Sequence, residues 1–270
     1  MLAAYGVLGR AVVSAASAVA LASLLGAVSS PQVAWASPPD VAWIEDVAVH
    51  PPGPAELAFE YEYRDAPDSA ADQNQHLIAL RTASGFDRAP FDLRPGVGFR
   101  ELAGGGTDLE YVEMRTRYRL VGTPAVPVAV LFLGYQLRPG ADSAHQLEQG
   151  VAVRLEAGPV RIAGEVSARE ELAGPGDTAA ELRGGVAVTA GATMGLIRYG
   201  VEAFALVPLT GPRLSDVAVG SDNEDITIYG GPSVRMNFEN FLWISLSAVY
   251  GGATDAGAPW MARANAGVQF

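Results

Sequence analysis

The sequence contains no cysteine, no lysine and only three histidines among its 270 residues. Without cysteine the chain has neither a disulfide framework nor a metal site ligated by thiolates. The three histidines, His50, His76 and His145, are scattered and do not form a cluster of metal ligands. We therefore expect no metal and no cofactor.

Positive charge is also scarce, because 18 arginines stand against 30 acidic residues and the net charge is −12. Nucleic-acid binding depends on clustered cationic charge on an exposed face, so this balance argues against a nucleic-acid partner. The 31 glycines and 18 prolines are spread along the whole chain. That distribution favours many short strands and turns over long helices.

The N-terminal segment, residues 1–36, carries a single charge, Arg10, ahead of an apolar run. Ala34 and Ala36 flank a tryptophan in the small-x-small pattern that signal peptidase reads. We predict that this segment is a signal peptide cut before Ser37. The alternative is an uncleaved membrane anchor, whose apolar run of roughly 18 residues is barely long enough to span a bilayer.

Residues 37–53 are rich in proline and contain one small apolar cluster, VAWIEDVAV. We interpret them as a periplasmic linker or arm; a plug lying in the lumen of a barrel is the alternative. A TonB box at EDVAV fits poorly, since removing 36 of the 270 residues leaves a chain too short for the 22-stranded receptors that use such boxes.

Residues 54–270 repeat one pattern, in which apolar and polar side chains alternate with a period of two over twelve segments. In one such segment Val112 and Met114 alternate with Glu113, Arg115 and Arg117. This period predicts β-strands with one apolar and one polar face. The segment 91–100 is the weakest of the twelve, because Pro95 cannot donate a hydrogen bond to a neighbouring strand.

Charge and turn length both indicate a membrane barrel rather than a soluble sheet. One face of the twelve strands carries almost no Asp, Glu or Arg, and a charge facing lipid costs about 2–4 kcal/mol at the bilayer midplane. Short turns alternate with longer loops, as they do between the periplasmic and outer ends of such barrels. Aromatic residues fall near the outer strand ends (Tyr61, Tyr63, Tyr135, Tyr250 and Trp260) and near the inner ends (Tyr118, Phe238 and Phe270), which predicts two interfacial girdles.

The final amphipathic strand, with Gly267 and the terminal Phe270, resembles the assembly signal of Gram-negative outer-membrane β-barrels. The resemblance implies an all-β fold, an antiparallel up-and-down transmembrane β-barrel of about twelve strands in the bacterial outer membrane. The chain is similar to the roughly twelve-stranded, transporter-like outer-membrane proteins, many of them uncharacterised, for which passive transport is the common label. It also implies contact with outer-membrane lipids and lipopolysaccharide, and with the barrel-assembly machinery through the last strand.

Interleaved arginine and glutamate side chains are predicted to line the lumen. A tight turn at Gly158 would place Glu156 opposite Arg161 and Glu148 opposite Arg169. The full predicted lumen set is Glu113, Arg115, Arg117, Arg119, Glu148, Arg154, Glu156, Arg161, Glu165, Arg169, Arg183, Arg198, Glu202, Arg235 and Arg263.

Two functions remain open for this lumen. One is a small passive channel for polar or anionic solutes, in which Arg115, Arg117 and Arg119 form a cationic ladder. The other is a closed barrel, whose charges satisfy one another and whose outer loops or N-terminal arm serve a structural or interaction role.

Catalysis and cation binding are less well supported. Barrel phospholipases place a serine two residues from a histidine, whereas Ile78 follows His76 and Leu147 follows His145 at that spacing. We therefore predict no catalytic residue and no enzyme. Acidic residues in the longest outer loop either bind divalent cations that bridge lipopolysaccharide or are simply solvated: Asp216, Asp222, Glu224 and Asp225.

Overall fold

The computed structural model describes residues 55–65, 75–85, 91–101, 106–123, 126–139, 144–173, 179–191, 197–210, 226–238, 242–251 and 260–269. They contain twelve strands: β1 (Ala55–Arg64), β2 (Gln75–Gly85), β3 (Phe91–Glu101), β4 (Thr107–Thr123), β5 (Val126–Arg138), β6 (Ala144–Ala157), β7 (Val160–Ala173), β8 (Ala180–Ala190), β9 (Ile197–Thr210), β10 (Thr227–Phe238), β11 (Leu242–Gly251) and β12 (Trp260–Gln269). The predicted signal peptide and arm, the acidic loop residues, His50 and Phe270 lie outside the described residues.

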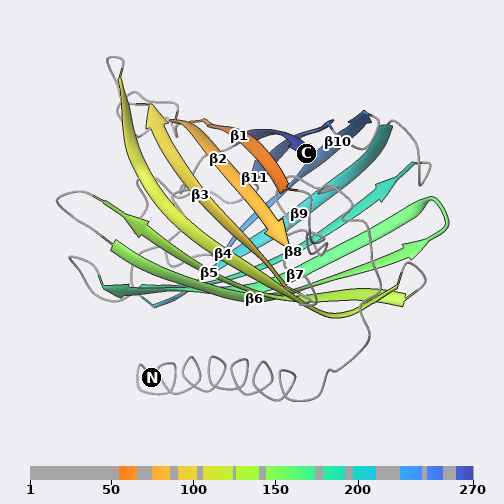
Figure 1. Ribbon diagram of the computed structural model, residues 1–270, viewed down its shortest axis with the longest axis horizontal. Helices are drawn as coiled ribbons and strands as arrows, with labels where there is room; N and C mark the ends of the chain where they lie inside the picture. The colour runs from red at the N-terminus through yellow and green to blue at the C-terminus, as the bar shows by residue number, and fades with distance from the viewer. Residues whose placement is uncertain are drawn as a thin grey trace.

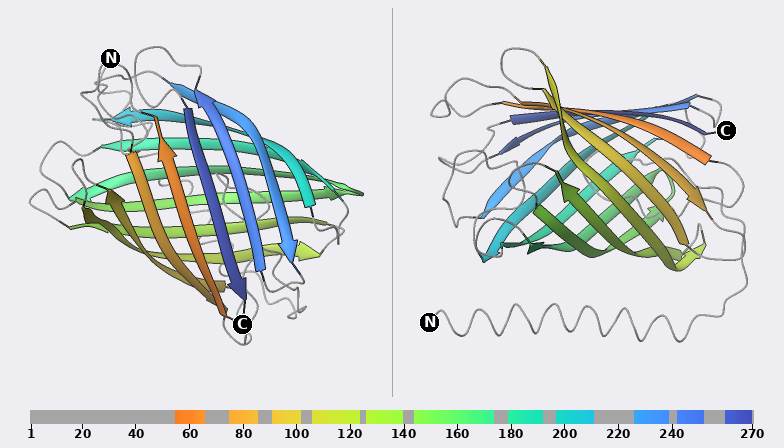
Figure 2. Two further views of the ribbon diagram at one scale, coloured as in Figure 1. Left: turned by 90° about the horizontal axis from the view of Figure 1, so that it is seen from above. Right: turned by 60° about the vertical axis from the view of Figure 1, so that its left-hand side comes forward.

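The twelve strands form one closed antiparallel barrel, in which each strand pairs with its neighbours in sequence (Figure 1). The barrel closes where β1 pairs with β12, with Leu57 opposite Val268 and Tyr63 opposite Ala262. Figure 2 shows β1, in orange, beside β12, in dark blue. The predicted all-β, twelve-stranded antiparallel barrel is therefore confirmed.

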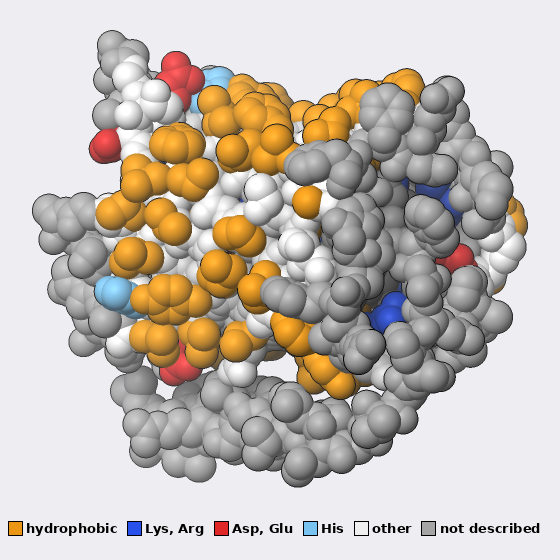
Figure 3. Space-filling view, in the orientation of Figure 1, with side chains coloured by type: hydrophobic (Ala, Val, Ile, Leu, Met, Phe, Trp, Pro, Cys, Tyr) orange, Lys and Arg blue, Asp and Glu red, His pale blue; other side chains and the backbone are white. Residues whose placement is uncertain are grey.

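The period-two alternation decides which side chains face outward. Large apolar side chains such as Val166, Tyr199 and Ile228 are more than half exposed on the outer wall. On the face seen in Figure 3, most of the coloured side chains are hydrophobic. Acidic and basic side chains such as Glu62 and Arg235 are almost completely enclosed by the barrel. This arrangement reverses that of a soluble protein and suits a wall that contacts lipid.

The lengths of the connections between strands distinguish the two ends of the barrel. Connections 65–74, 211–226 and 252–259 join strands at one end, and connections 124–125, 158–159 and 239–241 join them at the other. We call these the long-loop end and the short-turn end. Within the described ranges, no helix is long and apolar enough to cross a membrane.

The tightest turn sets the register of β6 and β7. Gly158 adopts a φ of 59°, in the left-handed region that glycine reaches at little cost. The predicted pairings follow, since Glu156 lies opposite Arg161 and Glu148 opposite Arg169. The register prediction is confirmed.

Pro95 does not prevent β3 from pairing on both sides. It lies opposite Met114 of β4 with its ring exposed on the outer wall, so the strand loses one backbone donor but keeps its alternation. Local irregularities do occur nearby: the β3–β4 register shifts between Gly98 and Phe99, and the β4–β5 register shifts after Arg119. Val121 consequently lies exposed, although strict alternation from Arg119 would point it inward.

Inward aromatic rings lie over glycines of the neighbouring strand. A Cβ atom added at any of these glycines would collide with the ring concerned. The four pairs are Tyr111 over Gly98, Phe132 over Gly150, Tyr229 over Gly251 and Trp243 over Gly267. Gly267 therefore has a packing role of its own, and its role in assembly stays a prediction.

The packing around Gly150 yields a prediction. Gly150→Ala should lower the free energy of unfolding by about 1–3 kcal/mol, because the new Cβ would meet the Phe132 ring, Ser167 and the backbone oxygen of Val166. Denaturant unfolding of the barrel in lipid vesicles would measure it. Gly184→Ala is the control and should be neutral, since nothing lies within 4 Å of its Cβ position. Equal stability of both variants would contradict the packing argument.

Candidate functional site

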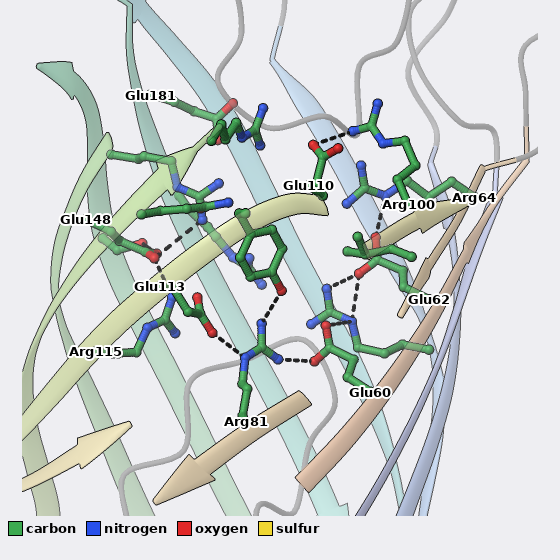
Figure 4. A pocket seen from close by; sticks show the side chains of 18 of the residues that line it. Glu60, Glu62, Arg64, Arg81, Arg100, Glu110, Glu113, Arg115, Glu148 and Glu181 are labelled. Atoms are coloured by element: carbon green, nitrogen blue, oxygen red, sulfur yellow. Dashed lines mark hydrogen bonds and ion pairs between the residues drawn. The ribbon is translucent and has the colours of Figure 1, made fainter. Parts of the chain in front are cut away.

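The candidate site is the lumen, where a cavity of about 110 Å³ lies in the half nearer the long-loop end (Figure 4). Arg64 and Arg138, which line it, each end a strand at that side of the barrel. Eight arginines and six glutamates contribute to the wall: Arg64, Arg81, Arg100, Arg115, Arg138, Arg169, Arg183, Arg263, Glu60, Glu62, Glu110, Glu113, Glu148 and Glu181. The wall is therefore strongly charged, with an excess of positive charge.

Arg81 joins three strands across one side of this cavity. Its Nη1 lies 2.5 Å from Glu60 Oε2, and its Nε lies 2.5 Å from Glu113 Oε1 (Figure 4). Its Nη2 also donates to the Tyr111 hydroxyl at 3.0 Å. Because all three nitrogens of the guanidinium are bonded, Arg81 is held in one orientation.

The same network crosses the seam that closes the barrel. Arg263 of β12 forms an ion pair with Glu62 of β1, and its Nε lies 3.8 Å from Glu60 Oε1. Glu62 also pairs with Arg64. Side chains as well as backbone hydrogen bonds thus connect the first and last strands.

Glu148 of β6 pairs with arginines of β4 and β7. Arg115 of β4 reaches it at 2.6 Å across β5, and Arg169 of β7 approaches it at 3.4 Å. Ser167 donates to its other oxygen at 3.3 Å. The carboxylate is thus one anchor shared by two arginines, and the pair predicted between Glu148 and Arg169 is part of a larger cluster.

Arg117 is enclosed on the side of the lumen nearer the short-turn end. It forms a two-pronged ion pair with Asp92 of β3, with Nη2 to Oδ2 at 2.5 Å and Nε to Oδ1 at 3.2 Å. Both side chains are 0% exposed. The predicted ladder of Arg115, Arg117 and Arg119 is therefore not a uniform row, because Arg115 and Arg117 belong to different ion pairs.

The structure brings the predicted lumen residues onto the inner wall but divides them between its two ends. Glu113, Arg115, Glu148, Arg169, Arg183 and Arg263 line the cavity, whereas Arg117, Arg119, Arg154, Glu156, Arg161, Arg198 and Arg235 lie toward the short-turn end, with Glu165 and Glu202 between. Arg183 pairs with Glu165 at 2.8 Å and lies over the Phe204 ring. Conduction past these residues stays a prediction.

Sequence reasoning missed several cavity residues, notably Glu60, Glu62, Arg81 and Tyr111, together with Asp92 beyond the cavity. The alternation of side chains does place four of them on the lumen-facing side of their strands: Glu60, Glu62, Arg81 and Asp92. The sequence therefore contained the information needed to include them. Tyr111 also stands at a lumen-facing position, on the same face as Glu113, but a tyrosine is compatible with either lipid or lumen and so did not stand out as a lumen residue.

The two described histidines lie on the outer wall near the long-loop end and contact tyrosines. Tyr61 is hydrogen-bonded to His76 Nδ1 at 2.6 Å, and Tyr135 to His145 Nδ1. The Tyr63 ring packs against both His76 and Trp260, so that Tyr61, Tyr63 and Trp260 of the predicted outer girdle lie close together around His76. Among the described residues, no group of three or more His, Cys, Asp or Glu is arranged to hold a metal ion.

The enclosed ion pair yields a stability prediction. Asp92→Leu should lower the free energy of unfolding by about 3–5 kcal/mol, because it leaves the Arg117 guanidinium enclosed without its carboxylate. Adding Arg117→Met should restore part of that loss in denaturant unfolding, because the ion pair of Asp92 with Arg94, at 3.5 Å, then stays broken.

Arg100→Met is the matched control for this pair. Arg100 bonds Glu110 at 2.7 Å but is 29% exposed, so its loss should cost less than about 1 kcal/mol. A double variant no more stable than Asp92→Leu alone would contradict this account of the buried pair.

Comparison with known proteins shows the fold and nothing finer. No protein-family model matches the chain, and no curated protein matches it. An outer-membrane channel from Pseudomonas putida F1 is similar with a TM-score of 0.64 at 10% identity, covering 83% of this chain and 98% of that one. The NanC porin is similar with a TM-score of 0.55 at 9% identity, covering 79% of this chain and 98% of that one. The chain thus has the fold of a bacterial outer-membrane β-barrel that resembles porins and outer-membrane channels.

Proposed function

We propose that the protein is a passive outer-membrane channel for small polar or anionic solutes. The observation that carries the proposal is the charged cavity in the lumen, where eight arginines outnumber six glutamates. The apolar outer wall is compatible with surrounding lipid, and a polar inner wall is compatible with water and ions in the lumen.

Barrel size supports a narrow path rather than a wide one. Eight strands leave an interior that side chains fill, whereas sixteen to eighteen leave an aqueous channel. Twelve strands lie between these cases, and Arg81, together with Glu113 and Tyr111, to which it bonds over β3, occupies part of the space beside the inner wall. The excess of arginine around the cavity would lower the energy of an anion more than that of a cation.

Export and assembly belong to the same proposal. Residues 1–36 would act as a cleaved signal peptide, residues 37–53 as a periplasmic arm and residues 54–270 as the barrel, surrounded by outer-membrane lipids and lipopolysaccharide. The apolar run followed by Ala34 and Ala36 supports the first assignment. The final strand, with Gly267 and Phe270, would be recognised by the barrel-assembly machinery.

The channel prediction is tested on one ion pair. In planar bilayers the protein should conduct in stable steps with a preference for anions. Arg115→Gln should weaken that preference, and Glu148→Gln should strengthen it, since each removes one charge of opposite sign from the cavity wall.

The two variants control for each other, because both break the same 2.6 Å ion pair. A change of selectivity in the same direction for both would therefore reflect altered packing rather than charge. A barrel that folds, as judged by heat-modifiable gel mobility, but never conducts would favour the alternative of a closed structural barrel.

The export prediction is tested by mass. The protein extracted from outer membranes should begin at Ser37. Replacing Ala34 and Ala36 together by leucine should retain the leader and raise the mass accordingly, because signal peptidase needs small residues at these positions. An unchanged mass in this variant would show that Ala34 and Ala36 do not direct the cleavage.

A further inference from the structure

Four arginines gather on the inner wall at the short-turn end, on strands β6 to β10. They are Arg154, Arg161, Arg198 and Arg235, which we call the arginine cluster. Arg161 and Arg198 are the second residues of β7 and β9, and Arg198 lies directly opposite Arg235 of β10. Arg161, Arg198 and Arg235 are at most 7% exposed.

The positive charges within this cluster repel one another. The positive charges of Arg198 and Arg235 both repel that of Arg161, and Arg154 repels Arg198. One carboxylate, Glu156, is shared, at 2.8 Å from Arg161 and 3.4 Å from Arg154.

The other two arginines also bond neutral oxygens, each has further contacts, and Arg198 is attracted by Glu156 as well. Arg198 donates to the backbone oxygen of Pro159 at 3.4 Å, and Arg235 donates to Asn237 Oδ1 at 2.8 and 2.6 Å. A second enclosed acid, Glu202, lies on β9 and has contacts of its own. Four cations therefore stand against two acids in a region shielded from solvent, where charge interactions are stronger than in water.

Two hydroxyls beside the cluster point independently to a ligand. Thr189 lies directly opposite Arg161, and Ser233 follows in the same row of the sheet, one strand beyond Gly200. Their side chains converge on Gly200, where an added Cβ would lie 2.6 Å from Thr189 Cγ2 and 3.1 Å from Ser233 Oγ.

Neither hydroxyl has a hydrogen-bond partner in the part of the chain that the structure describes. Thr189 is 3% and Ser233 8% exposed, so both groups are largely removed from water. An enclosed polar group without a partner is unfavourable, and native structures normally satisfy it with water or a ligand.

We propose that the arginine cluster, Thr189 and Ser233 bind a small oxyanion: inorganic phosphate, or the phosphate or carboxylate group of a solute. Guanidinium groups match oxyanions in both charge and the geometry of their paired N–H donors, and hydroxyls donate to the remaining oxygens. The long-loop cavity is a poorer oxyanion site, because six glutamates are interleaved with its arginines. Binding at the cluster does not require conduction.

Inorganic phosphate is the probe for this site. The full chain, produced with its own leader and extracted from outer membranes in detergent, is titrated with phosphate by calorimetry at constant ionic strength. The wild type should bind, and the double variant Thr189→Val with Ser233→Ala should bind at least tenfold more weakly, because one hydrogen bond to a charged group is worth roughly tenfold in affinity.

Ser247→Ala is the matched control. Ser247 lies opposite Ser233 on β11, and its hydroxyl already donates to the backbone oxygen of Pro232 at 3.2 Å. This variant should bind phosphate as the wild type does. Arg161→Gln should lose binding while keeping heat-modifiable mobility.

The outcomes separate the alternatives. If neither phosphate nor sulfate gives a binding isotherm with the wild type, or if the double variant binds as tightly as the wild type, the proposal is overturned. Tighter binding of a phosphate monoester than of phosphate would support the site and assign it to solutes that carry the group. A barrel that binds phosphate but never conducts would keep this site and reject the channel.

Discussion

The constraint on which the structure depends is that every backbone N–H and C=O facing lipid needs a partner within the protein. A sheet meets this requirement only when it has no open edge, and here the pairing of β1 with β12 removes the edge. Closure places the first and last described strands side by side, and Glu62 and Arg263, which meet there, are 201 positions apart in the sequence. The ion pair between Glu62 and Arg263 lies across this seam, so the charged lumen also contributes to closing the barrel.

Closure in lipid reverses the usual distribution of side chains and thereby creates the candidate site. Apolar side chains cover the outer wall, so the charged residues of each strand face a confined interior. Charges enclosed in this way are costly unless they are paired. In the lumen this cost is offset by ion pairs that share partners. Glu148 pairs with Arg115 and Arg169, and Arg81 pairs with Glu60 and Glu113. The same pairing that stabilises the barrel thus gives its interior a field of alternating sign.

Much of the fold could be predicted from the sequence because the alternation of side chains is local. It identified the strands and the inward face, and the two-residue turn at Gly158 also fixed one register, which is why Glu148 and Arg169 could be placed together. Partners in other strands could not be predicted, since their register depends on longer connections and on shifts such as the one after Arg119. The pairing of Arg117 with Asp92 could therefore not be predicted. The packing of aromatic rings over glycines of neighbouring strands could not be predicted either, because nothing in a single sequence indicates it.

The two ends of the lumen differ in electrostatic character, and this difference matters for any anion that passes through. In the long-loop half, arginines and glutamates are interleaved, so an anion meets attraction and repulsion within a few ångströms. At the short-turn end, Arg154 and Arg161 of the arginine cluster share Glu156, and Arg161 is repelled by the other two arginines, so positive charge dominates there. A channel conducts only if its sites bind an ion strongly enough to admit it and weakly enough to release it. If the barrel conducts and the arginine cluster binds oxyanions, release from the cluster would limit the rate for polyvalent anions, whereas monovalent anions would pass with less delay.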